Sequence, residues 1–138
     1  MSRPHVLLNE LSADECWALV AAHRPALGRV AFTDRGRVVV YPMNYAVTDR
    51  TVYLRTDPSS RLTTVAEARD VAFEVDEVDD AWERGWSVLA QGRLHEVVDD
   101  AELERNRELH LRSWAPGDRL HLLRLDVEHI SGRRIVVV

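Results

Sequence analysis

The sequence contains no lysine, so all 18 of its strongly basic residues are arginines. A lysine-free chain cannot form a Schiff base with pyridoxal phosphate, and it lacks the lysine that P-loop proteins use to bind nucleotide phosphates. If the chain binds a phosphate group, arginine side chains, hydroxyl groups and backbone N–H groups must hold it.

Cysteine is also scarce, because Cys16 is the only one. A single cysteine excludes an internal disulfide bond and a cysteine-rich metal site. The six histidines do not form the spacings H-x-x-x-H or H-E-x-x-H that are typical of zinc-binding helices, so the sequence predicts no metal site.

Long apolar runs are missing, and the first ten residues show no signal-peptide pattern. We therefore expect a soluble cytoplasmic protein without a membrane partner. The net charge of −5 argues against nucleic acid as a partner, because a basic surface is needed to neutralise phosphates. The acidic run from Asp76 to Asp80 is interpreted as a solvated rim.

A chain of 138 residues fits one domain. We expect a single domain over residues 1–138, in which residues 1–10 form a flexible or loosely packed segment. A domain of this size can bury a core but has little room for a deep private pocket. A cofactor pocket between two copies of the chain is therefore expected.

Two helices have clear start signals. A capping box that begins at Ser12 predicts a helix that ends near Pro25. Asp99 or Asp100 should cap another helix that runs to about Arg112. A further short helix is predicted at about 60–69.

Between these helices the pattern predicts strands at residues 28–33, 37–41, 51–56, 71–78, 86–97, 120–127 and within 130–138. Pro42 should end strand pairing or lie at an edge or bulge, and Gly92 should mark a bulge or a close approach. Six or seven antiparallel strands with two or three flanking helices favour a mainly β barrel.

Residues 53–62 combine a strand end, two arginines and several hydroxyl groups just before a predicted helix. A helix N-terminus exposes unpaired N–H groups and carries partial positive charge, which favours an anion. The candidate phosphate-binding residues are Arg55, Thr56, Ser59, Ser60 and Arg61. The alternative is that a serine only caps the helix and the arginines are solvated.

Two other segments carry candidate ring-binding residues. Pro42 interrupts a strand, Met43 could lie against a flat ring, and Asn44 offers a donor and an acceptor that match a flavin edge. Trp86 is a candidate pocket wall and Ser87 a candidate polar contact. The alternatives are a strand end with a core methionine, and an ordinary barrel-wall tryptophan.

Five motifs occur in a fixed order: Gly28-Arg-Val-Ala-Phe32, Tyr41-Pro-Met-Asn-Tyr45, Arg55-Thr-Asp-Pro-Ser-Ser-Arg-Leu62, Gly85-Trp-Ser-Val88 and Trp114-Ala-Pro-Gly117. Together they resemble the pyridoxamine 5′-phosphate oxidase-like family of flavin-binding split barrels. The similarity runs from about Glu10 to the C-terminus. It is closer to small actinobacterial-type members, which are related to nitroimidazole-resistance reductases.

The resemblance implies a six-stranded antiparallel split barrel and a homodimer with FMN at the interface. The flavin ring would be lined by Pro42, Met43, Asn44, Trp86 and Ser87. The cofactor phosphate would be held by Thr56, Ser60 and Arg61, with Arg55 as a further candidate. Trp114 would close the site, either from the same chain or from the partner subunit.

Hypotheses from two functional classes stay open. One is an FMN-dependent oxidoreductase that transfers a hydride between a nicotinamide or other donor and an unidentified small molecule. A variant of it uses the deazaflavin cofactor F420, whose acidic tail would bind Arg55, Arg61, Arg133 and Arg134. The other is a non-catalytic protein that carries a flavin, or a haem with His95 or His121 as an axial ligand.

Overall fold

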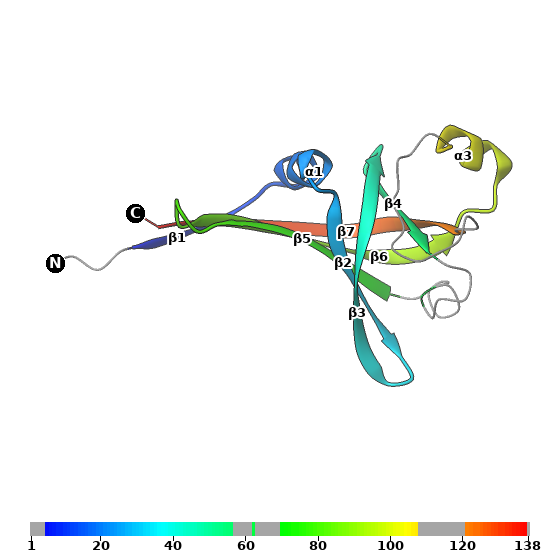
Figure 1. The fold of residues 1–138 in the computed structure, drawn as a ribbon, viewed down its shortest axis with the longest axis horizontal. Coiled ribbons are helices and arrows are strands. Elements are labelled where there is room, and N and C mark those ends of the chain that lie inside the picture. The colour runs from blue at the N-terminus through cyan, green and yellow to red at the C-terminus, as the bar shows by residue number, and fades with distance from the viewer. Residues whose placement is uncertain (1–4, 57–61, 63–69, 108–120, 138) are drawn as a thin grey trace.

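The computed structural model describes residues 5–56, 62, 70–107 and 121–137. The strands in Figure 1 are β1 (Val6–Glu10), β2 (Leu27–Asp34), β3 (Arg37–Thr48), β4 (Thr51–Thr56), β5 (Asp70–Asp79), β6 (Arg84–Glu96) and β7 (His121–Val137). The helices are α1 (Ala13–Ala22) and α3 (Asp100–Arg105). The helix predicted at about 60–69 lies almost entirely outside the described residues.

The strands form one sheet that closes on itself. Hydrogen-bonded neighbours follow the order β1-β7-β4-β3-β2-β5-β6, and β6 also pairs with β7. Each of these pairings is antiparallel. The mainly β split-barrel fold predicted from the sequence is therefore confirmed.

Apolar residues that alternate along the strands fill the barrel. Val30, Leu54, Phe73 and Leu125 come from four different strands, and each is at most 1% exposed. Gly28 faces the same interior, and a Cβ added there would lie 2.3 Å from Phe73 Cζ. The phenyl ring thus occupies space that only a glycine leaves free, and the residues between these inward positions form the outer surface.

β7 is one continuous strand of 17 residues, whereas the sequence predicted two separate strands in this region. Its first part pairs with β4 and its last part with β1, while β6 pairs with it on the other side. A Cβ at Gly132 would lie 2.8 Å from Cys16 Sγ. The glycine therefore admits α1 close to the sheet rather than ending the strand.

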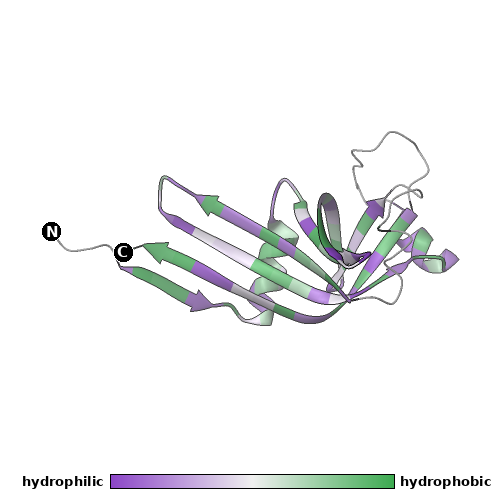
Figure 2. Cartoon of the chain, turned by 90° about the horizontal axis from the view of Figure 1, so that it is seen from below, coloured by the Kyte–Doolittle hydropathy of each residue, from purple (hydrophilic) through white to green (hydrophobic). Residues whose placement is uncertain are grey.

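Beyond the barrel, four strands continue as an arm, which we define as residues 6–10, 75–79, 84–88 and 130–137. α1 packs on one side of the arm, and the β2–β3 hairpin projects on the other side (Figure 1). Figure 2 views the arm from the side opposite α1, with its four strands side by side. β1 lies at the edge of this arm, all five of its residues are exposed, and no strand was predicted there.

The predicted helix caps are confirmed. Ser12 Oγ accepts a hydrogen bond from Glu15 N at 3.2 Å, and Glu15 Oε1 accepts one from Ser12 N at 3.0 Å. α1 ends at Ala22, just before Pro25. Asp99 caps α3 by accepting a hydrogen bond from the backbone N–H of Glu102 at 2.9 Å.

Gly92 and Pro42 illustrate two other local predictions. Gly92 lies at a register shift between β6 and β7, and a Cβ there would come within 1.9 Å of the Asp126 carbonyl oxygen. Pro42 does not end β3, because the strand continues to Thr48. Instead Pro42 pairs with Arg29 of β2 at a point where no described residue pairs with β3 on its other side, so the predicted edge position is confirmed.

Candidate functional site

The strands turn alternate residues away from both the core and α1, and we call this surface the outer face. The strand register assigns to it Val6, Leu8, Glu10, Arg29, Ala31, Val38, Val40, Pro42, Asn44, Glu74, Asp76, Val78, Ser87, Leu89, Arg133 and Ile135. Its exposed large apolar residues are Val6, Leu8, Val38, Val40, Val78 and Ile135. Val78, Ile135 and Leu8 share one cross-strand row on the arm, and Val38 and Val40 lie two residues apart on β3. Apolar side chains exposed in groups of this kind are typical of an interaction site.

Part of the outer face lies where β3 and β4 separate. The ladder between these strands stops at the pair Tyr45–Leu54. The next residues on the two strands are Asn44 and Arg55, and Pro42 follows two positions further along β3. We call this place the fork, and its three side chains belong to one face because strand residues alternate.

Asn44 carries the clearest sign of a binding function at the fork. Its Nδ2 donates a hydrogen bond to the Ala26 carbonyl oxygen at 3.1 Å. Its Oδ1 is buried and has no hydrogen-bond partner among the described residues. A buried polar atom without a partner costs about 1–3 kcal/mol, so this oxygen is suited to accept a hydrogen bond from a ligand.

Arg55 and two inward-facing residues complete the fork. Arg55 is a half-buried residue whose guanidinium forms no hydrogen bond or ion pair with another described residue, so its donors are available to an anion. Met43 packs against the core from the inner side, and Thr56 is buried at the end of β4. The structure therefore gathers these two predicted residues with Pro42, Asn44 and Arg55 around the end of one ladder.

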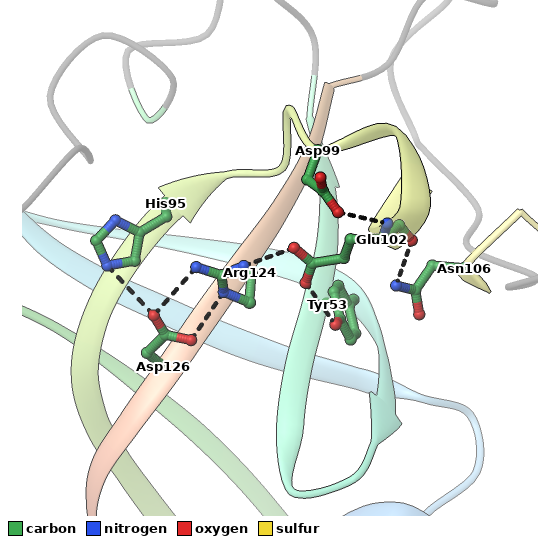
Figure 3. Close-up of polar contacts among 7 residues, drawn as sticks. All are labelled: Tyr53, His95, Asp99, Glu102, Asn106, Arg124 and Asp126. Atoms are coloured by element: carbon green, nitrogen blue, oxygen red, sulfur yellow. Dashed lines mark hydrogen bonds and ion pairs between the residues drawn. The ribbon is translucent and has the colours of Figure 1, made fainter. Parts of the chain in front are cut away.

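Next to Arg55 a polar network fastens α3 to the barrel (Figure 3). Tyr53 Oη donates a hydrogen bond to Glu102 Oε2 at 2.9 Å, and Arg124 Nη1 donates one to Glu102 Oε1 at 2.6 Å. The Glu102 carboxylate is buried, so the charge of Arg124 is what balances it. Burial raises the pKa of Tyr53, and the hydrogen bond to Glu102 raises it further.

The network continues on the far side of Arg124. Its Nε donates a hydrogen bond to Asp126 Oδ1 at 2.8 Å, and His95 Nε2 lies 3.3 Å from Asp126 Oδ2. Tyr53 pairs with Arg124 in the β4–β7 ladder, and the Leu54–Leu123 pair separates it from the pair that contains Arg55. We call the five residues Tyr53, Glu102, Arg124, Asp126 and His95 the α3 anchor, and it forms a fixed wall beside the fork.

Trp86 and Ser87 are not brought to the fork within one chain. They are neighbours on β6 and point to opposite faces, with Ser87 on the outer face and Trp86 toward the α1 side. Trp86 is 8% exposed, and its Nε1 donates a hydrogen bond to Glu77 Oε2 at 3.3 Å. Two strands, β2 and β5, separate β6 from the Pro42 position on β3.

A charged group on the outer face, formed by Arg29 of β2 with Glu74 and Asp76 of β5, was not predicted from the sequence. Arg29 Nη1 is 3.1 Å from Asp76 Oδ2 and 3.5 Å from Glu74 Oε1. Burial and the neighbouring Asp76 raise the pKa of Glu74 to about 7. Asp76 was interpreted as part of a solvated rim. The pairing with Arg29 depends on the β2–β5 register, for which the sequence gives no local signal.

The remaining predicted residues have a mixed outcome. Ser59, Ser60, Arg61 and Trp114 lie outside the described residues. Of the two histidines named for a haem, His95 contacts Asp126, and Nδ1 of His121 lies 2.6 Å from a Glu96 carboxylate oxygen. Within the described ranges no three His, Cys, Asp or Glu residues are grouped as metal ligands.

Comparison with known proteins supports a single family for most of the chain. Residues 12–134 match the family model described as Pyridoxamine 5′-phosphate oxidase. A protein of Mycobacterium tuberculosis described as uncharacterized is 32% identical over an alignment of 132 residues, and the match covers 92% of this chain and 85% of the relative. In the part of the chain that the structure describes, no helix is long and apolar enough to cross a membrane.

Two solved structures are similar over nearly their whole length. The FAD binding protein from Mycobacterium smegmatis is 35% identical with a TM-score of 0.79, and the match covers 92% of this chain and 98% of that one. A FAD-binding protein from Mesorhizobium loti is 27% identical with a TM-score of 0.77, covering 95% and 98% of the two chains.

Proposed function

The chain belongs to the pyridoxamine 5′-phosphate oxidase family, and we propose that it binds a flavin nucleotide at the fork and acts as a flavin-dependent oxidoreductase. The observation that carries this proposal is the buried Oδ1 of Asn44 beside the guanidinium of Arg55, since neither group has a partner in the part of the chain that the structure describes. A flavin nucleotide offers both complementary groups, because its ring edge carries an N–H donor and its chain carries a phosphate.

The ring would bind through β3. Asn44 Oδ1 would accept a hydrogen bond from the ring N–H, and its Nδ2 is held by Ala26, which fixes the orientation of the amide. Pro42 presents an exposed rigid surface beside it, and Met43 supports the strand from the core side. These contacts position the ring, and the bound flavin supplies the hydride chemistry.

The phosphate would bind through β4 and the chain that follows it. Arg55 supplies a guanidinium whose paired N–H donors suit phosphate oxygens. Thr56 ends β4 and leads directly into the segment that holds the predicted ligands Ser59, Ser60 and Arg61. The α3 anchor holds the residues beside Arg55 in fixed positions. This favours a pre-organised site over one that forms on binding.

The identity of the nucleotide is a separate question. The motifs resemble those of FMN-binding proteins, whereas the two similar solved structures are described as FAD-binding. FMN and FAD share the ring and the first phosphate, so the fork residues would contact either one. We propose FMN, and FAD is the alternative outcome of cofactor identification.

We further propose that two copies of the chain associate through their outer faces. The exposed valines Val38 and Val40 of β3 lie on this face, next to Pro42. Burial of such side chains favours association, at about 25 cal/mol for each Å² of apolar surface. Ser87 lies on the outer face of the more distant β6, so it would reach a flavin at the fork of the partner subunit.

The first experiment identifies the cofactor. Protein purified without added cofactor should be yellow, and mass spectrometry of the released ligand should give FMN. Stopped-flow reduction of the bound flavin by NADH or NADPH then separates an oxidoreductase from a non-catalytic carrier. A protein that binds F420 but neither FMN nor FAD would contradict the proposal, as would a haem Soret band.

A paired substitution tests the phosphate contact. Arg55→Ala should weaken flavin binding at least tenfold, because a charged hydrogen bond contributes about 1.5–3 kcal/mol. Arg37→Ala is the matched control, since Arg37 is exposed at the start of β3 and lies away from the fork. Flavin fluorescence titration measures both affinities, and equal losses would remove Arg55 from the site.

A charged residue on the outer face tests association. Val40→Glu should convert a dimer to a monomer in sedimentation velocity, because the carboxylate would have to be buried at the interface. Val98→Glu is the control, since Val98 is also an exposed valine but lies outside the outer face, between β6 and α3. A wild-type chain that remains monomeric at high concentration would refute the shared site.

A further inference from the structure

We propose that the α1 side of the arm holds a second small-molecule site, for a zwitterion whose ammonium and carboxylate groups are separated by an apolar body. The site is a groove of about 480 Å³. It lies on the opposite side of the sheet from the outer face, so it is separate from the proposed flavin site.

The strand register arranges the lining side chains in two rows. Glu77, Trp86 and Arg134 are direct cross-strand neighbours on β5, β6 and β7. Asp79, Arg84 and Val136 form the next row toward the tip of the arm. Each row crosses three hydrogen-bonded strands, so the spacing of its side chains is fixed by the sheet rather than by a loop.

The two charged residues of the second row pair with each other. Arg84 Nε lies 3.9 Å from Asp79 Oδ2, and the Arg84 guanidinium also lies 5.7 Å from the centre of the Trp82 ring. Val136 ends this row with an apolar surface. These contacts leave the second row as a wall, with little charge free to bind a ligand.

The first row holds two opposite charges apart. Glu77 Oε2 accepts a hydrogen bond from Trp86 Nε1 at 3.3 Å and lies 3.9 Å from His23 Nδ1, so the carboxylate is held in place. Arg134 forms no hydrogen bond or ion pair with another described residue, beyond a longer-range charge interaction with Glu15. Trp86 stands between the two charges and prevents them from neutralising each other.

This arrangement defines the ligand. Two strand spacings place the backbones of Glu77 and Arg134 about 10 Å apart, with the indole of Trp86 between them. A ligand ammonium fits beside Glu77 and a ligand carboxylate fits beside Arg134, where a bidentate contact is available. A single anion or a single cation would meet a like charge at one end of the groove.

The inference also gives Trp86 a role. Its ring is held by Glu77 and meets the His23 ring edge-on, with 5.4 Å between the ring centroids. It therefore forms a rigid apolar floor on the α1 side, away from the outer face on which Ser87 lies. The sequence resemblance placed Trp86 near the flavin ring, and the groove offers a different use for the same side chain.

The probe for this site is 6-aminohexanoate, which carries an ammonium and a carboxylate on a five-carbon apolar linker. Isothermal titration of the purified full chain should give saturable binding with one ligand per chain. Hexanoate and hexylamine each retain one charged group, and both should bind at least tenfold more weakly than the zwitterion. Similar affinities for all three probes would overturn the proposal. So would the absence of binding at a 6-aminohexanoate concentration about 50 times a roughly millimolar dissociation constant.

Adjacent arginines provide matched variants. Arg134→Gln should weaken 6-aminohexanoate binding at least tenfold, whereas Arg133→Gln should leave it within twofold, because Arg133 points to the outer face. Glu77→Gln keeps an acceptor for Trp86 Nε1 and should weaken binding of the zwitterion while leaving that of hexanoate unchanged or stronger. Equal losses in the two arginine variants would show that the probe binds elsewhere. Flavin affinity is measured in the same variants, and its retention keeps this test independent of the proposed function.

Discussion

The fork and the α3 anchor are neighbours on β4, yet they treat their polar groups in opposite ways. In the anchor, Glu102 is buried but receives hydrogen bonds from both Tyr53 and Arg124. At the fork, the buried Oδ1 of Asn44 has no partner among the described residues, and Arg55 has no ion pair with any of them. Only a pair of residues in the β4–β7 ladder separates the two regions.

The difference separates stability from binding. A buried polar group that is fully paired within the chain fixes local structure, whereas one left unpaired costs stability unless a ligand pairs with it. Buried polar groups that lack a hydrogen-bond partner in a folded protein are expected mainly at functional positions. We therefore expect substitutions in the anchor to change folding, and substitutions at the fork to change ligand affinity.

The largest effect is expected in the anchor. Arg124→Met leaves the Glu102 carboxylate buried without its positive partner, which should lower the free energy of unfolding by about 3 kcal/mol. Arg93→Met is the control, because the Arg93–Glu128 pair is exposed and should contribute less than about 1 kcal/mol. Urea denaturation of both variants measures the comparison, and equal losses would mean that the anchor is not a structural element.

The second prediction concerns the fork. Asn44→Ala should raise the flavin dissociation constant about tenfold, which corresponds to roughly 1.4 kcal/mol, while changing the stability of the ligand-free chain much less. Oδ1 has no partner among the described residues, and the Ala26 carbonyl that Nδ2 contacts also accepts a hydrogen bond from Tyr45 N, so that carbonyl stays paired in the variant. Asn9→Ala on the exposed β1 strand is the control. A large loss of ligand-free stability with unchanged flavin affinity would reverse the assigned roles of fork and anchor.

The smallest effect is expected at Glu74, whose carboxylate is intermediate between the paired groups of the anchor and the unpaired groups of the fork. Burial, with Asp76 nearby, raises the folded-state pKa of Glu74 to about 7, above an ordinary value of 4.5. The folded chain therefore binds this proton more tightly than the unfolded chain does. The resulting contribution to stability is present below pH 4.5 and is lost as the pH rises to about 7.

Glu74→Gln should remove this pH dependence. Because Glu74 is partly exposed and solvent screens its interactions, the variant should be more stable than the wild type at pH 8 by less than about 1 kcal/mol. Urea denaturation at pH 5 and pH 8 measures the change, with the exposed Glu128→Gln as control. The same slope against pH in wild type and Glu74→Gln would exclude Glu74 as its source.

Features that depend on neighbouring residues could be predicted from the sequence. The capping box at Ser12 needs only the next three residues, and the strand patterns need only local alternation. Gly92 and Pro42 were also assigned correctly to a register shift and to an edge. A glycine lets another backbone approach closely, and a proline lacks the N–H that ladder pairing needs.

Features that depend on distant pairing were missed. β1 is a strand because residues 6–10 pair with the opposite end of the chain, at residues 133–137. β7 is one strand because β6 pairs with it from residue 123 to residue 136, and these pairings join residues far apart in sequence. The separation of Trp86 from Ser87 was implied by strand alternation, but which face belonged to the core could not be known from β6 alone.

The sequence by itself determined a mainly β chain without lysine, in which arginines and an asparagine stand near strand ends and suit a phosphorylated cofactor. Tertiary structure alone decided that Asn44 and Arg55 meet where one ladder stops, that Arg29 joins Asp76, and that Glu77 and Arg134 stand on either side of Trp86. The physical reason is that strand register is set by hydrogen bonds between distant segments, and a shift of one residue would move each of these side chains to the other face.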